Sequence, residues 1–277
     1  MMIAVPAPAM VEKEQQLLAG LKRLDSLIVA LSGGADSAYL AWAAHSALGS
    51  RALCVTALSP SFAAYDREQV EALVRHAGLR HEFLDTHELE NPLYAANKAD
   101  RCYHCKDELF TALDCLASAR GFSAVAYGVN ADDTSDFRPG HRAAAEHRVL
   151  APLLDAKLAK EEIRQLSRRA GLSTWDRPAS ACLSSRIPYG SEVTPEKLAQ
   201  IERGEAILRE MGFRQFRVRH HGDLARIEIA PEEMERALRI DITRALAERF
   251  REAGFLYVTL DLDGYRQGSL NAALKLV

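Results

Sequence analysis

The sequence predicts an α/β protein in which a doubly wound, mostly parallel sheet is followed by a smaller α+β C-terminal unit. Three observations support this prediction. Strand-like apolar runs alternate with helical patterns, one strand enters a helix through a glycine turn, and the order changes after Gly190 to helix, two strands, helix and strand. Such alternation is typical of parallel strands joined by right-handed helical crossovers. We therefore expect one domain over residues 1–190 and a second over 191–277.

The first domain should contain four strands, because four short apolar runs are separated by turn residues and helical patterns. These runs cover residues 27–31, 51–59, 81–84 and 122–127. Apolar residues at helical spacing predict helices over 11–24, 38–48, 66–77, 107–119 and 160–170. Residues 151–154 are expected to form a short fifth strand. Ligands of such sheets gather at the carboxyl ends of the strands.

The second domain should begin with a helix over 195–211, because Thr194 suits the cap position and Pro195 the first turn. Strands are expected at 215–219, 224–229 and 255–261, with a helix over 231–253. The period of two in the first two strands places four charged side chains on one face: Arg217, Arg219, Arg226 and Glu228. The pattern alone favours a solvated face with cross-strand charge pairs. A clamp for phosphate or carboxylate stays open, because the guanidinium fork suits both anions.

Length and composition are those of an ordinary globular protein, with 277 residues of which 48% are hydrophobic and 26% charged. No apolar run approaches the length that spans a bilayer, and the first residues lack the pattern of a signal peptide. We therefore expect a cytoplasmic protein with no membrane partner. The formal net charge of −3 argues against a nucleic-acid partner, because neutralising phosphates requires a surplus of Lys and Arg.

The most informative stretch is Ser-Gly-Gly-Ala-Asp-Ser at residues 32–37, between an apolar strand and an apolar helix. Glycines permit positive φ and close backbone approach, and the first N–H groups of a helix are free to bind an anion. The hydroxyls of Ser32 and Ser37 flank this turn. The stretch lacks the lysine of a Walker loop and does not match the dinucleotide motif. It therefore predicts a phosphate site of another kind.

The hexapeptide resembles the pyrophosphate loop (PP-loop) of the ATP pyrophosphatases, whose fold is adenine nucleotide alpha hydrolase-like. The resemblance implies that ATP is cleaved between its α and β phosphates, that a substrate oxygen is adenylylated and that pyrophosphate leaves through the loop. The nucleotide-binding residues it implies are Ser32, Gly33, Gly34, Asp36 and Ser37. A phrase after the fourth strand resembles a second signature of this superfamily and supplies Asn130, Asp132 and Asp133. Of these residues we select Asp133 as the candidate Mg²⁺ ligand, and a solvated turn is the alternative.

Three of the five cysteines lie outside the predicted core. Cys54 and Cys115 are expected to be core thiols, because they lie in a predicted strand and an amphipathic helix. Cys102 and Cys105 form a CxxC just ahead of a predicted helix, and Cys182 lies in an irregular loop. A redox pair, a structural zinc site with a fourth ligand, and an iron–sulfur cluster with one open iron are all compatible with this pattern. The spacing alone does not separate them.

Taken with these cysteines, the chain resembles the LarE family, the ATP-dependent sulfur transferases that help build the nickel-pincer nucleotide cofactor of lactate racemase. The likeness rests on the phosphate loop and on three further stretches: Arg-Cys-Tyr-His-Cys-Lys at 101–106, Gly-Val-Asn-Ala-Asp-Asp at 128–133 and Pro-Ala-Ser-Ala-Cys-Leu-Ser-Ser-Arg-Ile-Pro-Tyr-Gly at 178–190. The resemblance implies a small-molecule substrate, pyridinium-3,5-biscarboxylic acid mononucleotide. A carboxylate of this substrate is adenylylated, and sulfur then displaces AMP to leave a thiocarboxylate. ATP, Mg²⁺ and a homo-oligomeric state are implied as well.

The family offers two sources of sulfur. In one subgroup a single sacrificial cysteine supplies it, and Cys182 matches that position. In the other, three cysteines hold a 4Fe-4S cluster that delivers an extra sulfide, and Cys102, Cys105 and Cys182 resemble this second pattern as catalytic residues and cluster ligands. The sulfide donor is unknown. The substrate-binding residues that the resemblance implies are Ser185, Arg186, Glu205, Arg217, Arg219 and Glu228.

Other functions compatible with the loop are sacrificial transfer from Cys182 alone, a PP-loop tRNA thiolase, and an amide synthetase in which the cysteines are incidental. A tRNA thiolase would normally add RNA-binding or zinc-ribbon segments and a basic surface, which this sequence does not show. A non-enzymatic, nucleotide-sensing domain would have no use for the loop that carries Cys182. Among these functions, sulfur transfer makes use of both the phosphate loop and the cysteines.

Overall fold

The computed structural model describes residues 8–135, 139–178 and 181–266. The chain forms two compact units, of which the first comprises Met1–Glu88 and Cys102–Ser180 and the second Leu89–Arg101 and Ala181–Val277. The chain therefore passes between the units three times. The domain boundary expected after Gly190 stays a prediction, because compactness alone does not say which part folds by itself.

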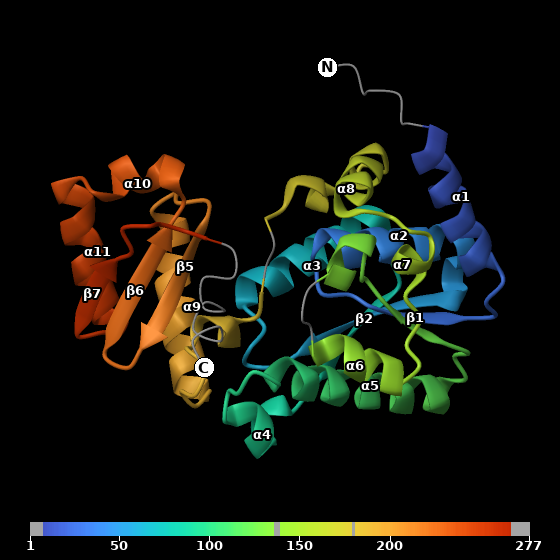
Figure 1. Ribbon diagram of the computed structural model, residues 1–277, viewed down its shortest axis with the longest axis horizontal. Helices are drawn as coiled ribbons and strands as arrows, with labels where there is room; N and C mark the ends of the chain where they lie inside the picture. The colour runs from blue at the N-terminus through green and yellow to red at the C-terminus, as the bar shows by residue number, and fades with distance from the viewer. Residues whose placement is uncertain (1–7, 136–138, 179–180, 267–277) are drawn as a thin grey trace. The chain divides into compact units, whose positions relative to one another are not determined.

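The first unit is built on a four-stranded parallel sheet in the order β3-β2-β1-β4 (Figure 1). Its strands are β1 (Leu27–Ala30), β2 (Ala52–Leu58), β3 (His81–Asp85) and β4 (Val125–Tyr127). In the middle of the sheet Val29 lies opposite Cys54 on one side and Ala126 on the other. The chain runs outward from β1 to β3 and then places β4 on the far side of β1, which confirms the predicted doubly wound sheet. The strand order thus reverses between β1 and β4, where such sheets bind ligands.

Helices cover both faces of this sheet, as Figure 1 shows. One face packs against α1 (Pro8–Lys22), α2 (Ala35–Leu48), α3 (Ala64–Ala77) and α8 (Lys160–Arg169). The other face packs against α5 (Arg101–Arg120) and α6 (Pro139–Glu146). The alternation along β1 explains the two cores, because Leu27 and Val29 point into the first and Ile28 into the second.

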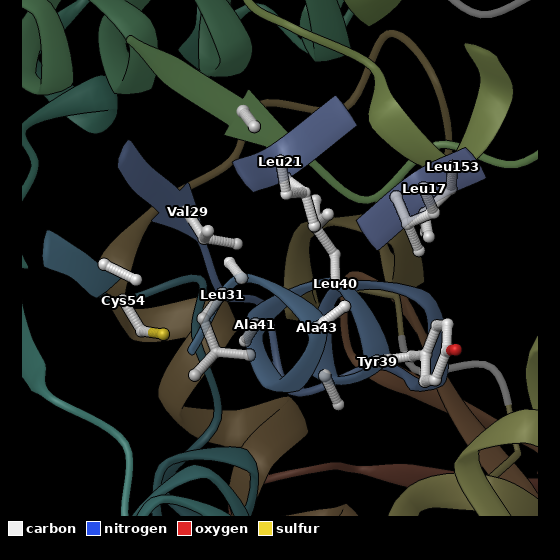
Figure 2. Close-up of a cluster of buried hydrophobic side chains, with 14 of the residues drawn as sticks. Leu17, Leu21, Val29, Leu31, Tyr39, Leu40, Ala41, Ala43, Cys54 and Leu153 are labelled. Carbon is white, nitrogen blue, oxygen red and sulfur yellow. The ribbon is translucent and has the colours of Figure 1, made fainter. Parts of the chain in front are cut away.

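The larger core surrounds α2, which is apolar on nearly every side. Figure 2 shows Leu40 and Ala43 of this helix in the same cluster as Leu21 and Val29, and all four side chains are buried. Full burial of a leucine contributes about 1.5–3 kcal/mol. Tyr39 is also buried, and its hydroxyl donates to Glu14 Oε1 of α1 at 2.8 Å. Helix α2 is therefore anchored firmly just after the glycine turn.

The second unit contains a three-stranded mixed sheet in the order β5-β6-β7. Strands β5 (Phe216–His221) and β6 (Leu224–Ile229) are antiparallel, whereas β6 and β7 (Tyr257–Leu260) are parallel. Its helices are α4 (Pro92–Ala95), α9 (Pro195–Glu210), α10 (Pro231–Ala237) and α11 (Ile240–Glu252). The expected cap of α9 is confirmed, because the side chain of Thr194 accepts from the backbone N–H of Lys197. The predicted order of helix, two strands, helix and strand is present, with its second helix interrupted.

Three elements differ from the expected ones. Helix α5 begins at Arg101, so that the CxxC lies inside it instead of ahead of it. Residues 152–155 form a helical turn, α7 (Pro152–Asp155), because proline favours the first helical turn. Leu150, one residue before the expected fifth strand, forms an isolated bridge with Ala126. The helix expected over 231–253 is divided between α10 and α11, because Arg239 has an extended backbone at their junction.

Short 3₁₀ helices complete the described chain at Gly49–Arg51, Glu88–Glu90, Ala131–Ser135, Ser173–Asp176 and Leu183–Arg186. The last two lie on either side of Cys182 in the sequence. Among the helices that the structure describes, none is long and apolar enough to cross a membrane.

Candidate functional site

The predicted phosphate loop lies between β1 and α2. Gly33 has a φ of +78°, and Gly34 caps the N-terminus of α2. Ser37 Oγ accepts from the backbone N–H of Ser32 at 3.2 Å and donates to the carbonyl oxygen of Gly34 at 3.1 Å. The two serine hydroxyls lie 3.0 Å apart. The turn therefore brings both hydroxyls to the helix N-terminus, where free N–H groups and the helix dipole favour an anion.

Arg177 supports the loop through a backbone contact. Its guanidinium NH1 donates to the carbonyl oxygen of Gly33 at 2.8 Å, and its NH2 pairs with Asp66. A Cβ atom on Gly33 would lie 2.8 Å from Val70 Cγ2 and 3.3 Å from Arg177 NH1, so this position needs glycine for space as well as for its φ. No role for Arg177 could be predicted from the sequence, because the contact joins residues 144 positions apart.

Gly128 brings the end of β4 against the same helix terminus. A Cβ atom at this position would lie 2.6 Å from the backbone nitrogen of Ser37 and 2.7 Å from its Cα atom. Backbone atoms cannot move aside as a flexible side chain can. The close approach of the 128–133 turn to the phosphate loop therefore depends on glycine.

Five polar side chains gather near the carboxyl ends of β1 and β4. Asp36 Oδ2 accepts from Asn130 Nδ2 at 3.3 Å and from Lys160 Nζ at 2.9 Å. Asn130 is fully buried, and its backbone N–H donates to Asp133 Oδ2 at 3.2 Å. Asp132 Oδ2 accepts from the backbone N–H of Lys160 at 2.8 Å, which ties this turn to the start of α8. The structure thus brings Asp36 and Asp133 into one network and adds Lys160, which had no motif in the sequence.

The carboxylate of Asp36 fits one position of a Mg²⁺ site. Its Oδ1 atom is buried and has no hydrogen-bond partner in the described part of the chain, although Oδ2 has two. Mg²⁺ commonly takes one or two carboxylates, keeps several waters and binds substrate phosphates. Across residues 8–135, 139–178 and 181–266, no group of three or more His, Cys, Asp or Glu side chains could hold a metal ion. A Mg²⁺ ion here would therefore depend on oxygens from a nucleotide and water.

Two of the three selected cysteines share one helical turn. Cys102 is exposed and Cys105 half-buried in the first turn of α5, in the first unit. Residues three apart on a helix are neighbours on its surface, so the thiols of Cys102 and Cys105 can bind the same ligand. Cys182 is half-buried and directly precedes the 3₁₀ helix Leu183–Arg186 in the second unit. One iron–sulfur cluster on all three thiols, with one iron left open, stays a prediction, because Cys182 belongs to the other unit.

The two remaining cysteines differ from each other. Cys54 is buried in β2, and burial raises the pKa of its thiol to about 12, which agrees with the expected core role. The same expectation for Cys115 is wrong. Cys115 and Thr111 lie one turn apart on the exposed side of α5, while Leu113 faces the core.

The six substrate-binding candidates lie in the second unit, and hydrogen bonds link five of them. Arg186 forms a two-pronged pair with Glu205, with Nε to Oε1 at 2.8 Å and NH2 to Oε2 at 3.0 Å. Arg219 NH2 donates to Glu228 Oε2 at 2.7 Å, and its NH1 donates to the carbonyl oxygen of Ser185 at 2.9 Å. Ser185 Oγ in turn lies 3.0 Å from Arg186 NH1.

The charged face of the β5-β6 hairpin is not a solvated one. Glu228 is fully buried and Arg219 is 5% exposed, which rules out the solvated interpretation that the alternation favoured. Arg226 NH1 lies 3.3 Å from Glu228 Oε1 and also pairs with Asp261. Buried charges of this kind need partners, and here each carboxylate has an arginine.

Arg217 is a further cation in this cluster. Burial lowers the pKa of its guanidinium, and the neighbouring charge of Arg186 lowers it further, although Glu205 opposes the shift. Burial alone would raise the pKa of Glu205, but the charge and hydrogen bonds of Arg186 outweigh burial and hold that pKa below its usual value. A bound anion would therefore favour the charged form of this guanidinium, which burial disfavours.

Glu233 fixes the backbone that leads into β5. Its Oε2 accepts from the backbone N–H groups of Arg214 at 3.0 Å and Gln215 at 3.2 Å, ahead of β5. Asp261 is a further carboxylate of the second unit that connects to Glu228, through Arg226. Its position in the sequence, 33 residues beyond Glu228 and after a separate helix, gave no signal of this connection.

The parallel sheet, the glycine turn into α2 and the polar cluster beside it define an α/β protein of the PP-loop class. No family model matches the chain. A pyridinium-3,5-bisthiocarboxylic acid mononucleotide synthase from Lactiplantibacillus plantarum is 34% identical over 263 residues, which cover 95% of each protein. The chain belongs to the family of that synthase, the LarE family. An uncharacterized protein of Synechocystis sp. is 45% identical over 251 residues, covering 91% of this chain and 94% of the relative.

Proposed function

We propose that this protein is an ATP-dependent sulfur transferase that converts a carboxylate of pyridinium-3,5-biscarboxylic acid mononucleotide to a thiocarboxylate. The observation that carries the proposal is an intact phosphate loop in a chain related over nearly its whole length to a synthase of the corresponding bisthiocarboxylic acid. A carboxylate is a poor electrophile, and adenylylation turns one of its oxygens into part of a good leaving group. An enzyme for this reaction needs a nucleotide site, a substrate site and a sulfur source.

The phosphate loop is the proposed nucleotide site. The β and γ phosphates of ATP would lie against Gly33, Gly34 and the first turn of α2, where Ser32 and Ser37 supply hydroxyl groups. Asp36 would hold Mg²⁺ through its unpartnered oxygen, with Asp133 as the weaker candidate. The bound ion would neutralise phosphate charge. Attack of the substrate carboxylate on the α phosphorus then releases pyrophosphate and leaves the acyl adenylate.

The arginine cluster of the second unit is the proposed site for the phosphate of the substrate. Arg217 supports this assignment, because a bound phosphate would favour the charged form of a guanidinium that burial disfavours. Arg186 and Arg219 are fixed by Glu205 and Glu228, so they can orient an anion with little further loss of side-chain freedom. Ser185 lies between these two arginines and adds a hydroxyl.

The second chemical step is the attack of a sulfide on the carbonyl carbon of the acyl adenylate. The C–S bond forms and the bond to AMP breaks, so that acyl adenylate and HS⁻ give thiocarboxylate, AMP and one proton. No electrons are gained or lost in this exchange. A 4Fe-4S cluster on Cys102, Cys105 and Cys182 would supply the sulfide at its open iron. The donor that replenishes this sulfide is unknown.

Pyrophosphate release tests the proposed substrate. The protein is incubated with ATP, Mg²⁺ and one candidate acceptor at a time, including the biscarboxylic mononucleotide, the same compound without its phosphate, and unmodified tRNA. We expect release with the mononucleotide, much weaker release with the dephosphorylated compound and none with tRNA. Release with tRNA alone would favour a tRNA thiolase and contradict the proposal.

Cysteine variants test the proposed sulfur source. Cys102→Ala, Cys105→Ala and Cys182→Ala should each abolish the brown colour of the anaerobically purified protein and its repeated turnover. Cys115→Ala is the matched control, because this exposed thiol lies on the same helix as the CxxC and should leave both properties unchanged. A colourless wild type that turns over once and stays active without Cys102 would favour sacrificial transfer from Cys182.

A further inference from the structure

Within the second unit, residues 94–101 are fastened to the loop that follows Cys182 by buried polar side chains. Asn97 is fully buried, and its Nδ2 donates to three backbone carbonyl oxygens at 2.8–3.2 Å, those of Ile187, Pro188 and Ser191. A backbone hydrogen bond adds to these contacts: the N–H of Gly190 donates to the carbonyl oxygen of Asn97 at 3.0 Å. One asparagine side chain thus organises the whole turn at 187–191.

Arg101 extends this contact toward Cys182. Its side chain is buried, and NH1 donates to Asn97 Oδ1 at 2.6 Å and to the carbonyl oxygen of Ser184 at 2.9 Å. The hydroxyl of Tyr94, also fully buried, lies 2.7 Å from Ser184 Oγ. We call Tyr94, Asn97 and Arg101 the clasp. Its three side chains hold both the beginning and the end of the loop at 184–191.

The backbone of Asn97 shows how tightly the clasp is determined. Its φ is +52°, in the left-handed region that non-glycine residues rarely adopt. Asparagine tolerates this conformation better than most residues, and the surrounding hydrogen bonds select it here. Unpaired polar groups in a buried hydrogen-bond network cost free energy, so the network favours the one arrangement of the loop in which they are paired.

Each end of the Arg101–Ser184 contact is close in sequence to a proposed sulfur-carrying residue. Cys102 is the next residue after Arg101, and Cys182 lies two residues before Ser184. We propose that Asn97 and Arg101 are positioning residues that fix the backbone of the loop next to Cys182 and thereby the place of its thiol. This role rests on the function proposed above, in which both thiols serve one sulfur carrier. The clasp itself touches neither nucleotide nor substrate in this proposal.

Cross-linking of the two thiols tests the clasp. The full chain is prepared with Cys105→Ser and Cys115→Ser, which leaves Cys102 and Cys182 beside the buried Cys54. The yield of the Cys102–Cys182 cross-link is then measured with dibromobimane, a short reagent that bridges two thiols. Arg101→Met and Asn97→Asp are added to this parent one at a time. Asn97→Asp keeps Oδ1 for Arg101 but removes the Nδ2 donor to the three carbonyls.

Arg203→Met is the matched control for the arginine variant. Arg203 NH2 also donates to a backbone carbonyl in the second unit, that of Ala253 at 3.2 Å, but it takes no part in the clasp. We expect efficient cross-linking in the parent and in the control. The yield should fall about 10-fold in Arg101→Met and Asn97→Asp, as the loss of a charge-assisted or multiple hydrogen bond predicts. Tyr94→Phe, which loses one hydroxyl and little volume, should give a smaller decrease.

Two results would overturn the clasp. One is a parent that does not cross-link, and the other is an unchanged yield in Arg101→Met and Asn97→Asp with native near-UV circular dichroism. If both variants fail to fold, an undiminished cross-linking yield in folded Tyr94→Phe also counts against the clasp.

Iron–sulfur reconstitution in the original cysteine background separates the proposal of the clasp from the proposal of the cluster. Failure of the wild type to bind iron, with a clasp-dependent cross-link, would refute the cluster alone, whereas normal assembly in Arg101→Met would refute the clasp alone.

Discussion

Lys160 Nζ lies 2.9 Å from Asp36 Oδ2, which joins the first turn of α8 to the first turn of α2 across 124 residues of sequence. The carboxylate that follows the glycine turn therefore has a cation from the protein itself. This cation stands beside the site proposed for the ATP phosphates, so Lys160 can both orient Asp36 and offset phosphate charge. Like the contact between Arg177 and Gly33, this pair was indicated by no motif in the sequence.

Replacing Lys160 should weaken ATP binding. We expect Lys160→Met to raise the KM for ATP about 10-fold or more, because a hydrogen bond to a charged group contributes about 1.5–3 kcal/mol. Lys13→Met is the matched control, since Lys13 also pairs with a carboxylate of α8, Glu162 at 2.8 Å. Steady-state pyrophosphate release at varied ATP concentration measures the effect. Equal KM values for the two variants would show that Lys160 has no part in the nucleotide site.

Replacing Gly128 should disturb the phosphate loop through the backbone of α2. A Cβ atom at this position would overlap the backbone of Ser37, so Gly128→Ala should lower the free energy of unfolding by about 1–3 kcal/mol and weaken nucleotide binding. Gly20→Ala serves as the control, because Gly20 lies inside α1 with its nearest side-chain atom 3.9 Å away. That variant should be neutral or more stable by about 0.5–1 kcal/mol. Urea unfolding that ranks the two variants in the opposite order would contradict the packing described here.

Replacing Arg217 should separate stability from substrate affinity. Arg217→Met removes a guanidinium whose pKa burial and Arg186 hold low, so the free energy of unfolding should change by less than about 1 kcal/mol. The KM for the mononucleotide substrate should rise about 10- to 100-fold if Arg217 binds its phosphate. Arg226→Met is the contrasting variant, because it removes a partner of the buried Glu228 and should cost about 1–3 kcal/mol of stability. A loss of stability in Arg217→Met with unchanged KM would assign Arg217 a structural role.

Stability should also depend on the protonation of His147, which bridges two carboxylates of α5. Its Nδ1 lies 2.7 Å from Asp114 Oδ2 and its Nε2 lies 3.0 Å from Asp107 Oδ1. Burial opposes the charged form, but these two carboxylates outweigh burial and raise the pKa of His147 above 6.5. A raised pKa in the folded state stabilises the protein fully below pH 6.5, and this contribution disappears as the pH rises through the raised pKa.

The pH dependence of a variant checks this sign. The difference in unfolding free energy between wild type and His147→Gln should be largest below pH 6.5 and should shrink as the pH rises. Asp107→Asn should reduce the pH dependence without removing the imidazole. A difference that grows with pH, measured by urea unfolding across the range, would show that the pKa of His147 is not raised in the folded protein.

The sequence predicted those parts of the molecule that local patterns determine. The four strands, the glycine turn and the helix after it follow from apolar runs and from residues that permit a tight turn. The start of α5 was missed because the polar segment around Cys102 carries no apolar periodicity, although the structure makes it helical. The residues 151–154 were misassigned because a short apolar run does not distinguish strand from helix.

The contacts that complete the site depend on residues far apart in the chain. Arg177 meets Gly33, and Arg101 meets Ser184, through contacts that span 144 and 83 residues. The charged face of the hairpin was judged solvated because period two shows which side chains share a face but not what covers it. The structure brings the Ser185 carbonyl onto Arg219 of that face, and no local pattern predicts this contact.

The mass of the intact protein after turnover tests the proposed sulfur source most directly. The protein is reconstituted anaerobically with iron and sulfide, supplied with ATP, Mg²⁺, excess sulfide and the biscarboxylic mononucleotide, stripped of metal and weighed by mass spectrometry. A sulfide carried by a cluster on Cys102, Cys105 and Cys182 predicts an unchanged protein mass together with more than one thiocarboxylate per chain. A mass reduced by the elements of H₂S at Cys182, with at most one thiocarboxylate per chain, would contradict that account.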